Sequence, residues 1–126
     1  MNTRILFNVS AAIEIVTGIG MLVVPAFLIG LLLGDGLGPI GIAVTRVLGI
    51  GLLSLGIAGW DSQEQAKGTV LGPRTGLVVY NIAATAMFVY LGTTGAMNGL
   101  LLWPAAAIHL VISLLMLRAI TRHPQE

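Results

Sequence analysis

Residues 40–60 read IGIAVTRVLGIGLLSLGIAGW, and Arg46 is the single charged residue among them. About 20 mostly apolar residues in a helix, each rising about 1.5 Å, are enough to cross the hydrocarbon core of a bilayer. The segment satisfies both conditions. We therefore predict that it is a transmembrane helix. The number of other segments of similar length and apolarity then predicts the fold.

The composition of the whole chain also indicates a membrane protein. Of its 126 residues, 56% are hydrophobic and 9% are charged, and the mean hydropathy is +0.98. A soluble domain carries about a quarter charged residues, so we expect the lipid bilayer to be the solvent and partner of this chain. A net charge of +1 gives no basic cluster for nucleic acid, which is not an expected partner. The absence of cysteine excludes disulfides and thiolate chemistry.

Three further segments are long and apolar enough to span, at about residues 5–33, 75–91 and 97–120. The first is too long for one crossing and contains Pro25, which removes a backbone donor. We predict a kink or break there, with AFLIGLLLG (26–34) as a short second piece. Glu14 interrupts the first apolar run and no small-residue cleavage site follows, so we expect a retained helix and not a signal peptide. The expected fold is all-α: a single domain over residues 1–126 forming a bundle of four transmembrane helices.

The basic residues predict the orientation of these helices. They flank the N-terminus, the loop after residue 60 and the C-terminus, as Arg4, Lys67, Arg74, Arg118 and Arg122. The loops at 34–39 and 92–99 contain no lysine or arginine. Because cytoplasmic loops carry the excess of basic residues, we predict that both termini are cytoplasmic.

Three ionisable side chains lie inside the predicted spans: Glu14, Arg46 and His109. Burying an ionised group at the bilayer centre costs about 2.5–3.5 kcal/mol even on lenient scales, so such residues need partners or a function. Counting about 1.5 Å per residue places all three near the midplane. Polar residues at spacings of three and four accompany them. The predicted ligand-binding residues are Glu14, Thr17, Arg46, Tyr80, Asn81, Thr85, His109 and Ser113.

Two interpretations of this cluster stay open. Glu14 and Arg46 can form a structural ion pair, with Asn81 and His109 completing the hydrogen bonds. Alternatively, the cluster is a site that binds a polar ligand head or relays a proton, since histidine exchanges its proton near neutral pH. In an enzyme, Glu14 and His109 are the candidate catalytic acid and base.

Cofactor binding is expected to be absent, with one alternative. His109 can be a neutral, hydrogen-bonded histidine, or it can be an axial ligand of haem. A bis-histidine haem within one chain is excluded because the other histidine, His123, lies in the C-terminal tail. Glu14 and His109 are too few ligands for a metal site, so none is expected.

The layout resembles the DoxX-like group of small four-helix bacterial membrane proteins. The likeness rests on VVPAF (23–27) at the end of the first span, on RVLGIGLLSLGIAGW (46–60) and on short loops. It implies a multi-pass protein of the bacterial inner membrane. A local likeness of AAIEIVTG (11–18) is to the small multidrug resistance transporters, in which a membrane-embedded glutamate serves proton and substrate. This chain departs from them in carrying Arg46 and His109 within its spans.

Three functions follow from these features. The first is binding or transport of a small, partly lipophilic molecule at the midplane cluster, with proton linkage through Glu14 or His109. The second is an intramembrane isomerase or oxidoreductase acting on a quinone, isoprenoid or epoxide, in which Arg46 stabilises developing negative charge. The third is a structural or assembly subunit of a larger membrane complex. A homo-oligomer is also expected, because four short helices enclose little space.

Overall fold

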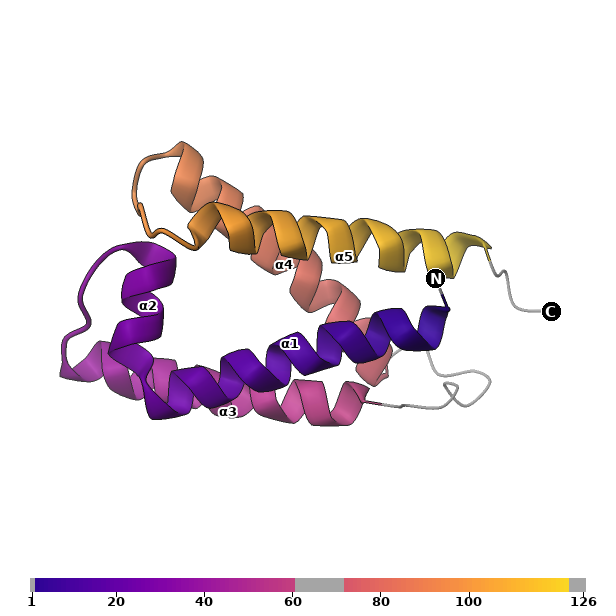
Figure 1. The fold of residues 1–126 in the computed structure, drawn as a ribbon, viewed down its shortest axis with the longest axis horizontal. Helices are drawn as coiled ribbons and strands as arrows, with labels where there is room; N and C mark the ends of the chain where they lie inside the picture. Colours follow the sequence, from indigo (N-terminus) through magenta and orange to yellow (C-terminus); the bar gives the residue numbers. More distant parts are fainter. Residues whose placement is uncertain (1, 61–71, 123–126) are drawn as a thin grey trace.

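The computed structural model describes residues 2–60 and 72–122, and these form five helices with no strand (Figure 1). Most of the predicted loop after residue 60, including Lys67, lies outside the described residues, as does His123. The helices are α1 (Thr3–Val23), α2 (Pro25–Leu33), α3 (Pro39–Gly59), α4 (Pro73–Thr93) and α5 (Leu102–Arg122). All but α2 are long and apolar enough to cross a membrane. The prediction of an all-α, four-span bundle is confirmed.

The predicted break at Pro25 is also confirmed. Helix α1 ends at Val23, and Val24 leaves the helical region with φ −130° and ψ 55°. Pro25 then opens α2, where its missing N–H costs nothing because the first turn has no intrahelical acceptor. Gly34, at φ +83°, ends α2 in the left-handed conformation that favours glycine. The first apolar run is therefore one full span followed by a separate short helix.

The α4–α5 loop packs against the end of α2, and for this reason the last span starts later than predicted. Helix α5 begins at Leu102 and not near residue 97. The N–H groups of Asn98 and Leu101 donate to the carbonyls of Leu33 (3.1 Å) and Leu31 (2.8 Å). These bonds satisfy carbonyls at the C-terminus of α2 that have no partner within the helix. Hydropathy could not locate the start of α5, because loop residues that bond the end of α2 can be as apolar as residues inside a helix.

Helices α1 and α3 pack with their backbones in close contact. A Cβ atom on Gly18 would lie 2.7 Å from the Gly49 carbonyl oxygen, and one on Gly56 would lie 2.7 Å from the Ala11 carbonyl oxygen. Small residues thus face each other two turns apart on each helix, which is how transmembrane helices reach short separations.

The bundle consists of two helix pairs that meet at one end. Helix α1 packs chiefly on α3 and α4 on α5, and the two pairs converge near the N-terminus of α1 and the C-terminus of α5 (Figure 1). At the other end α2 spans from the first pair toward the α4–α5 loop (Figure 1). The core at the converging end comprises Leu6, Phe7, Ala11, Leu77, Val78, Ile112 and Met116. A second cluster around α2 comprises Met21, Ile29, Leu32 and Leu52.

Candidate functional site

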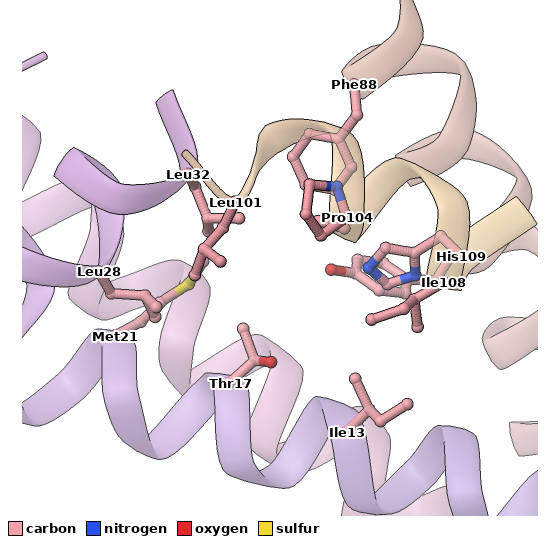
Figure 2. Close-up of a pocket in the computed structure, with 12 residues that line it drawn as sticks. Ile13, Thr17, Met21, Leu28, Leu32, Phe88, Leu101, Pro104, Ile108 and His109 are labelled. Carbon is pink, nitrogen blue, oxygen red and sulfur yellow. The ribbon is translucent and has the colours of Figure 1, made fainter. Parts of the chain in front are cut away.

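A cavity of about 210 Å³ lies between the helix pairs and beneath α2 (Figure 2). Three of its lining residues are polar: Thr17 from α1, Tyr80 from α4 and His109 from α5. The structure thus brings these three predicted residues together at one cavity. The remaining lining is apolar and comprises Ile13, Met21, Leu28, Leu32, Phe88, Leu101, Pro104, Ala105 and Ile108.

Aromatic neighbours enclose the His109 ring at the cavity wall. Tyr80 meets it edge-on, with ring centroids 5.7 Å apart and an interplanar angle of 79°. Phe88 lies 5.8 Å away in a tilted arrangement. Edge-on and tilted pairs at these separations are favourable aromatic contacts. Together they hold the imidazole in one orientation, with the ring directed from α5 into the open space of the cavity (Figure 2).

Asn81 joins three helices behind this wall and is 0% exposed. Its Nδ2 donates to the Ser10 hydroxyl on α1 (2.9 Å) and to the Leu77 carbonyl of its own helix (2.8 Å). Its Oδ1 lies 2.8 Å from Nδ1 of His109 on α5. Polar groups from the first, third and fourth spans therefore meet at Asn81, whereas the convergence predicted at the midplane was that of Glu14, Arg46 and His109.

Glu14 lies in a second layer behind the cavity. Its side chain is 1% exposed and is hydrogen-bonded to the Tyr80 side chain. Its Oε1 atom is buried without a hydrogen-bond partner. Glu14 is not among the lining residues, whereas Tyr80 is, so the hydrogen bond to the tyrosine connects the carboxyl group to the cavity. Two polar residues that line the cavity are therefore hydrogen-bonded to buried residues behind them: Tyr80 to Glu14, and His109 to Asn81.

Thr85 and Ser113 are close to this network, but their hydroxyls are used within their own helices. Thr85 donates to the Asn81 carbonyl (2.8 Å), and Ser113 donates to the His109 carbonyl (2.7 Å). Neither residue lines the cavity. Such bonds satisfy a hydroxyl in an apolar surrounding and leave no donor for a ligand.

Arg46 is exposed on the outer side of α3, whereas Glu14 is enclosed, so the structure does not bring this predicted pair together within the chain. The buried face of α3 is formed by Thr45, Gly49, Leu52, Gly56 and Gly59. Arg46 follows Thr45 by one residue, which turns it about 100° further around the helix. Glycine packing against α1 therefore turns Arg46 away from the bundle interior.

The apolar lining was not predicted from the sequence. Phe88 could have been found, because it lies seven residues after Asn81 and therefore on nearly the same helix face. Leu28 and Leu32 could not, because their role depends on where α2 folds back. Ser10, which is not among the predicted ligand-binding residues, is the α1 partner of Asn81.

Neither a metal centre nor a known relative assigns the site. Within residues 2–60 and 72–122, no group of three or more His, Cys, Asp or Glu residues could hold a metal ion. No family model, curated protein or solved structure matches the chain. The resemblances to the DoxX-like group and to the small multidrug resistance transporters are therefore supported by no match, and what the structure shows is a layout of four apolar helices.

Proposed function

We propose that this protein binds a small, mostly apolar molecule within the membrane, in the cavity beneath α2. The observation that carries the proposal is an apolar cavity in which two polar lining residues, Tyr80 and His109, are hydrogen-bonded to buried residues. Ligand sites are typically apolar pockets with a few placed polar groups that fix orientation. A bundle that needed only stability would be better served by filling the space with side chains.

The cavity volume limits the size of the ligand. At about 210 Å³ it exceeds the roughly 150 Å³ of an engineered cavity that accepts benzene, and is smaller than the 300–1,000 Å³ of typical drug-sized sites. A single substituted ring, a short branched chain or one end of a longer lipid fits this range. Haem is larger than a drug-sized ligand, so the dimensions argue against His109 as a haem ligand.

Transport and proton linkage extend the same proposal. Glu14 is connected to the cavity through Tyr80 and has an oxygen without a partner, so a proton gained there alters the hydrogen bonding of the tyrosine. Coupling ligand release to that proton would make the protein a transporter. Loss of pH-dependent uptake in Glu14→Gln, with ligand binding retained, is the expected result.

A second candidate function is an intramembrane enzyme acting on a lipophilic substrate. It is favoured by the contact of Tyr80 with His109, two groups able to exchange protons at one wall of an apolar cavity. Isomerisation by proton transfer needs no more than such a pair. Conversion of a bound lipophile by wild type and not by Tyr80→Phe would distinguish this function from binding alone.

We propose that the protein resides in the bacterial inner membrane with both termini in the cytoplasm. The basic residues Arg4, Arg74 and Arg118 lie near the ends of α1, α4 and α5 that converge, whereas Asp35 lies in the loop at the opposite end (Figure 1). This asymmetry is what the positive-inside rule associates with a cytoplasmic face. A fluorescent protein that becomes fluorescent only in the cytoplasm would be fused to each terminus in turn. We expect both fusions to be fluorescent.

Binding is tested by filling the cavity with a larger side chain. Ala105 lines it, whereas Ala107 is exposed on the same helix, so Ala105→Phe and Ala107→Phe form a matched pair. Gently purified protein in nanodiscs would be analysed by native mass spectrometry for bound small molecules and by ¹⁹F NMR for saturable binding of 4-fluorotoluene. We expect wild type and Ala107→Phe to bind and Ala105→Phe to lose binding. Equal binding by all three proteins would refute the proposal.

A further inference from the structure

We propose that the ligand of this cavity is a hydrogen-bond donor, a hydroxyl or N–H compound, whose donor hydrogen is accepted by Nε2 of His109. This inference rests on the proposed binding function and names the class of ligand. It follows from the hydrogen bonds in which the side-chain hydrogens of Asn81 and His109 are already used.

The orientation of the Asn81 amide is determined by its neighbours. The Leu77 carbonyl oxygen, 2.8 Å away, can only accept, so the atom facing it is the nitrogen Nδ2. The second hydrogen of Nδ2 goes to the Ser10 hydroxyl at 2.9 Å. Both amide hydrogens are then used, and the atom facing His109 is the oxygen Oδ1.

This orientation determines the tautomer of His109. Because Oδ1 has no hydrogen to give, the 2.8 Å contact requires the hydrogen to be on Nδ1. A neutral imidazole with Nδ1–H carries its lone pair on Nε2. Nε2 is the ring nitrogen farther from the backbone, and the ring itself projects into the cavity (Figure 2). The protein therefore presents an acceptor to the ligand at this position.

Neither of the other two polar lining residues, Tyr80 and Thr17, has a hydrogen bond to Nε2 of His109 in the structure, so this acceptor is left for the ligand. The Tyr80 hydroxyl is hydrogen-bonded to Glu14. Thr17 projects from α1 on the facing side of the cavity (Figure 2). A ketone, quinone or ether placed against His109 would set its oxygen lone pairs against the lone pair of Nε2. An alcohol or phenol of the same shape would donate. Leaving a buried acceptor unpaired lowers affinity by about tenfold or more.

The test compares ligands that differ only in this hydrogen. Binding of 4-fluorophenol, 4-fluorotoluene and 4-fluoroanisole to wild-type protein in nanodiscs would be measured by ¹⁹F NMR, with empty nanodiscs correcting for partition into lipid. We expect 4-fluorophenol to bind about tenfold more tightly than the other two probes. Equal affinities would overturn the donor inference while leaving cavity binding intact. Failure of all three probes to saturate would overturn both.

A variant and a spectroscopic measurement assign the preference to His109. In His109→Phe the preference for 4-fluorophenol should fall below about twofold, whereas Thr85→Val, whose hydroxyl bonds within its helix, should keep it. Retention of the preference in His109→Phe would overturn the assignment. If that variant does not fold, ¹⁵N NMR of the wild-type histidine gives the answer. A protonated Nδ1 and an Nε2 resonance that shifts with 4-fluorophenol but not with 4-fluorotoluene are expected; an Nε2–H tautomer would overturn the inference.

Discussion

Replacing Asn81 with leucine removes the hydrogen bonds that join α4 to α1 and α5 and retains a side chain of similar size. Asn81 bonds Ser10 on α1 and His109 on α5, while its third bond, to Leu77, lies within α4. Interhelical hydrogen bonds in membranes are worth about 0.6 kcal/mol on average and about 1.7 kcal/mol at most. Two such bonds predict a loss of about 1.2 kcal/mol, with an upper bound of about 3.4 kcal/mol.

Thr85→Val is the matched control, because its hydroxyl bonds the carbonyl of Asn81 in the same helix and joins no second helix. We expect it to lower the free energy of unfolding by less than about 0.5 kcal/mol. Reversible unfolding in mixed micelles, followed by tryptophan fluorescence and confirmed by steric trapping in bilayers, measures both variants. A double-mutant cycle with Ser10→Ala isolates the bond between Ser10 and Asn81, and we expect a coupling energy of at least about 0.5 kcal/mol.

An Asn81→Leu variant no more destabilised than Thr85→Val would show that the two interhelical bonds add no stability. A zero coupling energy with Ser10→Ala would refute the α1–α4 bond in particular. In either case Asn81 would not be what holds the site together, and the orientation of His109 would rest on its ring contacts with Tyr80 and Phe88.

Three further predictions concern packing and charge. Gly18→Ala should lower the free energy of unfolding by about 1–3 kcal/mol, because its Cβ meets the α3 backbone at 2.7 Å, while Gly51→Ala, with nothing within 4 Å, should not. Arg46→Leu should leave the stability in nanodiscs unchanged or raise it, since the arginine is exposed; a loss of about 3–5 kcal/mol would instead indicate a buried ion pair with Glu14. Gly99→Ala should speed hydrogen exchange of the loop amides that bond α2, because its Cβ would collide with the Leu32 backbone; unchanged exchange would contradict this contact.

The spans and the break between α1 and α2 could be predicted from the sequence because their causes are local. A run of apolar residues long enough to cross a bilayer does so whatever its neighbours are. Pro25 ends one helix and begins another by its own ring and missing N–H. The polar stripes of α1, α4 and α5 were predictable for a related reason, since a buried polar group needs partners that lipid does not supply.

The candidate site could be predicted only in part. Tyr80, His109 and Thr17 line the cavity, with Glu14 and Asn81 directly behind. The roles of Thr85 and Ser113 were not predictable, because a hydroxyl that bonds its own helix and one that faces a ligand have the same sequence spacing. The apolar walls could not be distinguished from the rest of an apolar sequence.

Hydropathy and residue spacing are enough to predict a helical membrane protein of four spans, with polar residues on several helices. The rotation of each helix about its own axis, in contrast, depends on tertiary contacts. Thr45 is buried and the adjacent Arg46 is exposed because Gly49 and Gly56 let α3 approach α1 along one line. The cavity exists because the helix pairs meet at one end while α2, bonded to the α4–α5 loop, spans the other. Both results depend on contacts between residues distant in the sequence, which local hydropathy and spacing do not encode.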